Sequence, residues 1–146
     1  MEHVIPHESE KEKASNSYLM SLMAIVVGLP LPIVNLVATA IFWLANRKST
    51  YFVKWHCTQA MLSQLVLVFI NSRSFWWTIS ILFGSEVVSN EYFAYLFMVL
   101  ILNIFEFVTT MYVMIQVRKG NHVHFWFFGG LTDMFVKKED SQEALA

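Results

Sequence analysis

Cysteine and charged residues are both scarce in this sequence. Its single cysteine, Cys57, cannot form an internal disulfide and is too little for a cysteine-rich zinc site. Only 14% of the 146 residues are charged, whereas a soluble domain carries about a quarter. The net charge of −1 and the lack of a basic stripe exclude a strongly basic nucleic-acid-binding protein. Much of the surface must therefore face something other than water.

Catalytic motifs are missing as well. The sequence has no nucleophile elbow, no H-E-x-x-H, no phosphate-binding loop and no pair of carboxylates at a catalytic spacing. We therefore expect no enzymatic activity, no metal and no cofactor. Residues 1–17 contain four Glu and two Lys, so they are not a cleavable signal sequence. They are expected to form a polar cytoplasmic N-terminus.

The sequence does contain long apolar stretches. Hydrophobic residues make up 56% of the chain. Residues 18–45 carry no charge, residues 57–83 are interrupted by the run Asn71-Ser72-Arg73-Ser74, and residues 92–117 carry one charge, Glu106. A spanning helix needs about 20 apolar residues, so the last stretch predicts a transmembrane helix.

The first apolar stretch contains a Gly/Pro break, Gly28-Leu29-Pro30-Leu31-Pro32. Proline removes a backbone donor and clashes with the preceding turn, so two prolines in three residues interrupt a helix. One interpretation is a single kinked span. The other, which we favour, is a pair of short helices over 15–29 and 33–45, joined by a tight turn.

Basic residues predict the orientation. They gather in two places, after the first apolar stretch and after the last: Arg47, Lys48, Lys54; Arg118, Lys119, Lys137, Lys138. Both places should be cytoplasmic by the positive-inside tendency, which puts the connection at 84–91 on the outer side. An even number of helices then places both termini in the cytoplasm. We expect an integral protein of the bacterial inner (cytoplasmic) membrane.

The predicted fold is an all-α polytopic membrane protein with four transmembrane helices. The helical membrane domain covers 18–135, and a polar tail follows at 137–146. The predicted elements are, in chain order, helices at 15–29, 33–45, 50–72 and 92–117, with interfacial segments at 75–83 and 121–136.

Polar residues inside the predicted helices form the first candidate site. Asn103, Glu106 and Thr110 follow a spacing of i, i+3 and i+7, which places them on one face of a helix. Glu106 lies 12 residues from Arg118, hence about 18 Å deep. A carboxylate at that depth should be paired, protonated or next to water.

Two amides lie at a similar depth on other helices. Asn35 is about 18 Å from the level of Arg47, and Gln64 is about 15 Å from that of Lys54. We therefore expect an intramembrane polar cluster in which protonated Glu106 donates to Gln64, or else to Asn35. The cluster is either structural, holding helices together, or the lining of a path for protons or substrate.

A second group lies nearer the cytoplasmic headgroups. His56, Gln59 and Ser63 also follow i, i+3 and i+7, and we expect them to form an interfacial polar seam. A metal ligand at His56 would need partners; His122 and His124 could supply them only if the fold brings them close. An interfacial or capping histidine is the simpler interpretation.

Three motifs resemble a known family. They are "GLPLPIVNLVATAIFWLANRKS", "YFVKWHCTQAMLSQ" and "VRKGNHVHFWFFGG". In the second motif the matching residues are Phe52, His56, Gln59, Ala60 and Gln64. Across residues 18–135 the chain resembles small bacterial membrane proteins similar to the twenty-kilodalton membrane subunit of the chloroplast inner-envelope import (TIC) translocon. The resemblance implies four membrane helices and an association with protein translocation.

The expected function is a non-enzymatic accessory subunit of a larger membrane complex, in protein translocation if the resemblance applies. One alternative is a small oligomeric transporter or channel whose path is lined by Glu106 and its neighbours. A weaker alternative is a membrane immunity-type protein. The expected partners are the lipid bilayer and other membrane protein subunits, and no nucleic acid.

Overall fold

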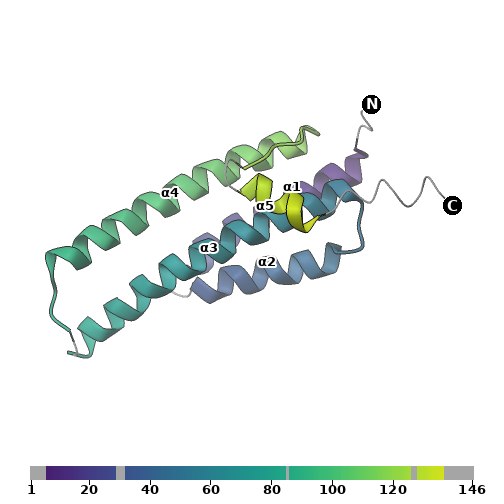
Figure 1. Ribbon diagram of the computed structural model, residues 1–146. Helices are drawn as coiled ribbons and strands as arrows, with labels where there is room; N and C mark the ends of the chain where they lie inside the picture. Colours follow the sequence, from purple (N-terminus) through teal and green to yellow (C-terminus); the bar gives the residue numbers. More distant parts are fainter. Residues whose placement is uncertain (1–5, 29–31, 85, 126–127, 137–146) are drawn as a thin grey trace.

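The computed structural model describes residues 6–28, 32–84, 86–125 and 128–136. These residues form five α-helices and no strand (Figure 1). The all-α prediction is confirmed for this part of the chain. The expected polar tail lies outside the described residues.

The first apolar stretch forms two helices. Helix α1 is Glu8–Gly28 and helix α2 is Pro32–Asn46. They pack against each other, as in the two-helix interpretation rather than the single kinked span. The turn predicted between them, at 29–31, lies outside the described residues.

Helix α1 begins earlier than predicted, inside the segment expected to be a separate polar terminus. The carboxylate of Glu10 accepts a hydrogen bond from the backbone N of His7 at 2.7 Å, the reciprocal arm of a capping box. Glu8 in the first turn pairs with Lys11 at 2.8 Å, and an acidic first turn suits the helix dipole. The polar residues therefore extend the helix by two turns.

Helix α3 is the longest element. It is Tyr51–Leu82, with 32 residues, or about 48 Å. The prediction that it ends near residue 72 is wrong, and 75–83 is not a separate interfacial segment. The polar run at 71–74 contains no Gly or Pro, and Asn71 finds a partner on the next helix, so nothing interrupts the backbone ladder.

Helix α4 is Asn90–Arg118, about 44 Å long. Ser89 caps its start by accepting a hydrogen bond from Tyr92 N at 3.2 Å. At its end Gly120 has φ +87°, and the bonds Gly120 N to Val117 O and Asn121 N to Gln116 O form a Schellman motif. This left-handed turn directs the following residues back over the end of the bundle.

The residues after this turn form the C-terminal arm, defined here as 121–125 together with helix α5, Phe128–Phe135. Helix α5 packs on α3. Phe125 is 5% exposed and joins the hydrophobic core, which is centred at this end of the bundle. The predicted interfacial segment at 121–136 is thus partly a packed element, and 126–127 lie outside the described residues.

Helix α1 contacts α2, α3 and α4, whereas α3 and α4 touch each other less. Figure 1 shows α3 and α4 continuing well beyond α2 and joining at the far end. We call that end, residues 76–84 and 86–93, the α3–α4 tip. The core and the C-terminal arm lie at the opposite end.

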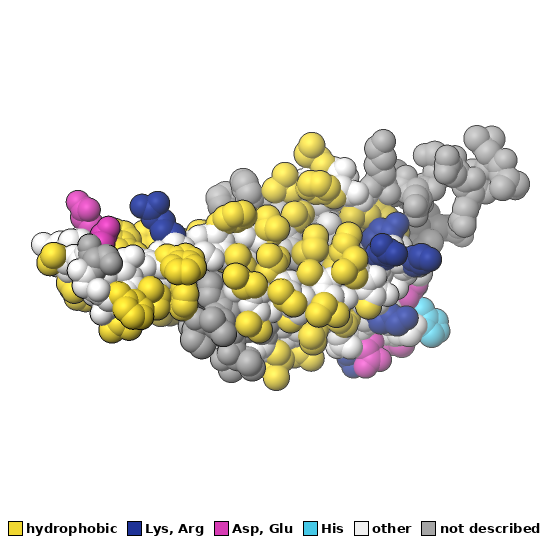
Figure 2. All heavy atoms as spheres, turned by 90° about the horizontal axis from the view of Figure 1, so that it is seen from below, with side chains coloured by type: hydrophobic (Ala, Val, Ile, Leu, Met, Phe, Trp, Pro, Cys, Tyr) yellow, Lys and Arg dark blue, Asp and Glu magenta, His cyan; other side chains and the backbone are white. Residues whose placement is uncertain are grey.

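The surface between the two ends is hydrophobic. Figure 2 shows apolar side chains along the length of the molecule, with charged side chains gathered at one end and at the narrow tip. Two described helices, α3 and α4, are long and apolar enough to cross a membrane. Only 11% of the apolar window of α3 and 22% of that of α4 is buried, which is unlike core helices of a soluble protein.

Candidate functional site

The polar face predicted on α4 divides between two sets of contacts. Asn103 exchanges two side-chain hydrogen bonds with Asn71 on α3, at 3.1 and 2.8 Å. One turn further on, Thr110 Oγ1 donates to Glu106 Oε1 at 3.2 Å. At Asn103 the face therefore contacts α3, and at Thr110 it makes a contact within α4.

The interior partner expected for Glu106 is different in the structure. Ser63 from α3 and Thr110 from α4 interact with its carboxyl group. Gln64 is fully buried, and neither its Nε2 nor its Oε1 has a hydrogen-bond partner. The predicted Glu106–Gln64 bond is therefore absent, and the carboxyl group interacts with the hydroxyls of Ser63 and Thr110 instead. Asn35 lies on α2, but its side chain is outside the described residues.

Gln59 attaches the C-terminal arm to the bundle. Its Oε1 accepts from Phe125 N at 3.0 Å, and its Nε2 donates to Val123 O at 3.3 Å and to Tyr18 Oη at 2.9 Å. The side chain has no exposed surface. Ser63, by contrast, bonds back to Ala60 O at 3.1 Å, so the predicted seam of His56, Gln59 and Ser63 is not one continuous contact.

His56 is completely buried within the protein, and its place at the depth of the headgroups stays a prediction. Its Nδ1 lies 2.9 Å from Tyr18 Oη, and its Nε2 lies 3.3 Å from His122 Nδ1. The fold does bring the arm histidines close, since the His122 and His124 rings lie 4.9 Å apart. We call His56, His122 and His124 the histidine cluster.

Asp133 and Trp55 complete the surroundings of this cluster. Trp55 Nε1 donates to Asp133 Oδ1 at 2.7 Å, and Asp133 Oδ2 lies 3.8 Å from His124 Nδ1. Burial lowers the pKa of His122, and a charge on His124 lowers it further, whereas Asp133 raises it. In the described part of the chain, no group of three or more His, Cys, Asp and Glu is arranged to hold a metal ion.

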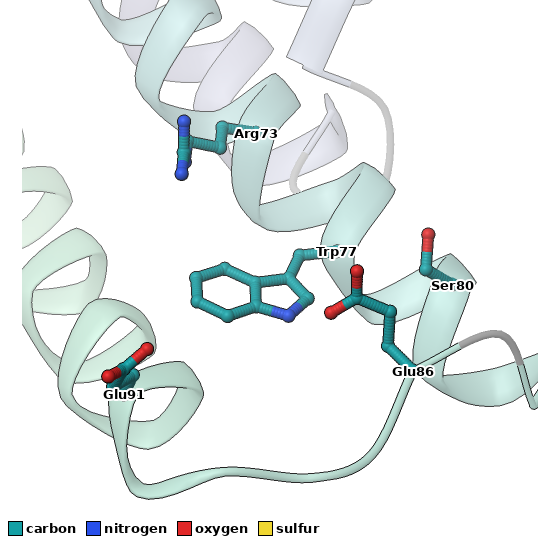
Figure 3. A pocket seen from close by; sticks show the side chains of 5 residues that line it. All are labelled: Arg73, Trp77, Ser80, Glu86 and Glu91. Carbon is teal, nitrogen blue, oxygen red and sulfur yellow. The ribbon is translucent and has the colours of Figure 1, made fainter.

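A hollow of about 450 Å³ opens at the α3–α4 tip. Figure 3 shows the Trp77 indole in its middle, with Glu86 and Ser80 on one side and with Arg73 and Glu91 around the other. The indole Nε1 has no hydrogen-bond partner. The hollow therefore presents two carboxylates together with the Arg73 guanidinium at the end of the molecule.

The two ends differ in charge. Between Arg73 and Glu106 the sequence contains only two charged residues, Glu86 and Glu91. The opposite end holds the basic residues around the ends of α2 and α4 and the start of α3: Arg47, Lys48, Lys54, Arg118, Lys119. The molecule thus has an acidic tip, an apolar middle and a more basic end.

These features define a protein whose described residues are helical, with two membrane-capable helices and an acidic hairpin tip. Comparison with known families identifies its family: the profile of the magnetosome magnetite crystal formation protein family (MamF/MmsF) matches residues 14–131. The chain belongs to this family. No curated protein and no solved structure matches it significantly.

This finding corrects the resemblance drawn from the sequence. The TIC-like family is the wrong family, and the expectations of an accessory translocation subunit, of a transporter or channel and of an immunity-type protein are wrong with it. The motifs behind the resemblance were apolar segments, a Gly/Pro break and aromatic residues beside basic ones. Many small membrane proteins share these features for physical reasons, so they do not separate families.

Several residues of these sites were not singled out in the sequence. In the sequence Asn71 belongs to an interruption of an apolar stretch, although its depth of about 26 Å from Lys54 is similar to the depth of Asn103 from Arg118, about 23 Å. Tyr18 and Asp133 carried no local signal, because their partners are distant in sequence. Glu86 and Glu91 stand out by their charge, so the sequence alone could have identified them.

Proposed function

We propose that this protein is an integral protein of the magnetosome membrane that takes part, without enzymatic activity, in forming the magnetite crystal. In this proposal the α3–α4 tip faces the compartment in which the crystal grows. The observation that carries it is the family match over 14–131, combined with a tip whose charged residues are both acidic.

The membrane arrangement follows from charge and length. We propose four membrane helices, with the basic end and both termini on the cytoplasmic side. From Lys54 to Arg73 helix α3 rises about 28 Å, which is close to the thickness of a hydrocarbon core, about 30 Å. The turns of α3 beyond Arg73, and the start of α4, then project past the core on the opposite side.

The short helices fit this membrane with a small adjustment. Helix α2 has 15 residues and a length of about 23 Å. It falls about 7 Å short of the core, a mismatch that local thinning of the bilayer accommodates at modest cost. The exposed apolar side chains of α3 and α4 then contact lipid, among them Phe69, Phe97 and Phe105, exposed by 71%, 65% and 65%.

The acidic tip suits contact with iron ions or with a growing oxide surface. Carboxylate oxygens are the ligands that hard cations prefer. Glu86 and Glu91 line one open hollow, so they present their oxygens on the same side of the molecule. The bilayer is the proposed partner of the apolar surface; contacts with other membrane proteins and the absence of nucleic-acid binding stay predictions.

The experiment is complementation of a magnetosome-forming strain that lacks this protein. The wild type and an E86Q/E91Q variant are expressed to equal membrane levels, and crystal dimensions are measured by electron microscopy. A matched control, E10Q/E12Q, removes two carboxylates from the opposite end. We expect the control to restore wild-type crystals and E86Q/E91Q to leave the size distribution of the deletion strain.

Two results would contradict the proposal. A deletion strain with unchanged crystals would remove the role in crystal formation. Full restoration by E86Q/E91Q would remove the role of the acidic tip while leaving the family function in place.

A further inference from the structure

The C-terminal arm is held to the bundle by a continuous chain of hydrogen bonds that starts at buried side chains and ends at His122, which is exposed. The chain runs from Gln59 Nε2 to Tyr18 Oη at 2.9 Å, on to His56 Nδ1 at 2.9 Å, and from His56 Nε2 to His122 Nδ1 at 3.3 Å. Gln59, Tyr18 and His56 have no exposed surface. Each proton in the chain therefore needs an acceptor within the protein.

The contacts of Gln59 fix which groups donate and which accept along this chain of hydrogen bonds. Gln59 Oε1 accepts from the Phe125 backbone N, and its Nε2 donates to the Val123 carbonyl. The amide cannot flip without placing two donors or two acceptors against each other. Its Nε2 must then donate to Tyr18 Oη, which leaves the Tyr18 hydroxyl proton to be donated onward.

The onward steps follow from the inventory of donors. The Tyr18 hydroxyl donates to His56 Nδ1, the acceptor placed beside it. A neutral imidazole that accepts at one nitrogen donates at the other, so His56 Nε2–H donates to His122 Nδ1. That nitrogen has to be unprotonated. A proton on His122 Nδ1 would set two N–H groups against each other at 3.3 Å.

We infer that the C-terminal arm is a proton-sensitive clasp: protonation of His122 breaks its bond to His56 and releases the arm from the end of the bundle. The released state exposes Trp55 and Gln59, which are fully buried when the arm is docked. The clasp does not depend on the role of the tip in crystal formation.

The groups around His122 favour its neutral form in the docked state. They are His56 on α3, Tyr18 on α1 behind it, His124 on the arm and Asp133 on α5. Asp133 is the one anion among them, and it is already engaged by Trp55 Nε1 at 2.7 Å and faces His124 at 3.8 Å. Burial, and then His124, hold the pKa of His122 below its ordinary 6.5.

The sign of the effect follows. A histidine whose pKa is lower when docked than when free takes up a proton on release, so acid favours release. The contribution of His122 to docking is complete above pH 6.5. It is lost as the pH falls from that value through the lowered pKa of the docked state.

Hydrogen exchange of the full-length protein in detergent micelles tests this. The readout is the Phe125 amide, bonded to Gln59 Oε1 at 3.0 Å, with α4 amides as the measure of the intact bundle. After correction for intrinsic exchange, we expect Phe125 protection to fall about tenfold or more between about pH 8 and about pH 5. The α4 amides should stay protected.

Three variants test whether His122 causes the pH dependence. H122Q should abolish the pH dependence. H124Q removes a neighbour that lowers the His122 pKa, so it should move the midpoint to higher pH. H7Q alters an exposed histidine just before α1, outside this chain of hydrogen bonds, and should behave as the wild type.

Constant Phe125 protection in the wild type overturns the clasp, as does an H122Q variant that loses protection over the same pH range. If H122Q does not fold, H124Q decides, because it keeps His122. An unmoved midpoint in H124Q overturns the inference.

Discussion

Asn71 and Asn103 face each other across the α3–α4 pair and exchange two hydrogen bonds, with each Nδ2 donating to the other Oδ1. This pair lies where α3 and α4 leave the other helices and continue toward the tip. It fixes how the two helices are aligned, because sliding either one by a residue breaks both bonds.

The coupling between these two residues can be measured. Side-chain hydrogen bonds within membranes average about 0.6 kcal/mol and reach about 1.7. For N71A, N103A and the double variant, a thermodynamic cycle in mixed micelles should give a coupling of about 1 kcal/mol. Asn103 also donates to Val99 O, so N71A should cost less than N103A. A coupling near zero would contradict the alignment role.

Tyr18 should matter more for stability than its single hydroxyl suggests. Y18F keeps the ring but leaves Gln59 Nε2 and His56 Nδ1 without their partner in a buried site. An unsatisfied buried group costs about 1–3 kcal/mol, so the free energy of unfolding should fall by about that amount.

The matched control is Y112F on α4, where the tyrosine is 56% exposed. It should change the free energy of unfolding by less than about 0.5 kcal/mol. Equal effects of Y18F and Y112F, measured by denaturant unfolding in micelles, would argue against the buried hydrogen bonds of Tyr18.

Adjacent glycines in α5 should respond in opposite directions to alanine. A Cβ at Gly129 would lie 2.8 Å from His124 Cβ and Nδ1, whereas one at Gly130 meets nothing within 4 Å. G130A should stabilise the helix by up to about 1 kcal/mol through propensity, and G129A should displace His124 and weaken arm docking. Amide exchange in α5 measures both. Equal gains in protection would show that Gly129 is not a close approach.

The helices themselves could be predicted from the sequence, but not all of their ends. Apolar runs and the Gly/Pro break indicated α1, α2 and α4. The predicted end of α3 was wrong because Asn71 and Arg73 look unfavourable inside an apolar helix. Asn71 pairs with Asn103, and the Arg73 guanidinium lies over the Tyr95 ring at 5.9 Å. Tertiary contacts therefore stabilise both polar side chains.

The candidate sites show a second limit. Depth can be counted along a helix at about 1.5 Å per residue, and it put Gln64 and Glu106 at one level. It does not say which way a helix is rotated in the bundle. Glu106 therefore meets Ser63 and Thr110, and Gln64 meets no polar partner.

His56 shows a third limit. Its expected position near the headgroups does not indicate that other parts of the protein cover it, yet it is fully buried. The covering residues come from the C-terminal arm, whose path depends on the left-handed turn at Gly120. The Lys-Gly-Asn sequence after α4 signals such a turn, but it does not reveal where the arm docks.

The orientation of the α3–α4 tip is the central claim, and thiol labelling of sealed magnetosome vesicles tests it most directly. V87C and K48C are each made in a C57A background; Val87 is 87% exposed at the tip, and Lys48 follows α2 at the basic end. With a membrane-impermeant maleimide, we predict that K48C is labelled in sealed vesicles and V87C only after the vesicles are opened. Labelling of V87C in sealed vesicles at the rate of K48C would place the tip on the cytoplasmic side and contradict its contact with the crystal.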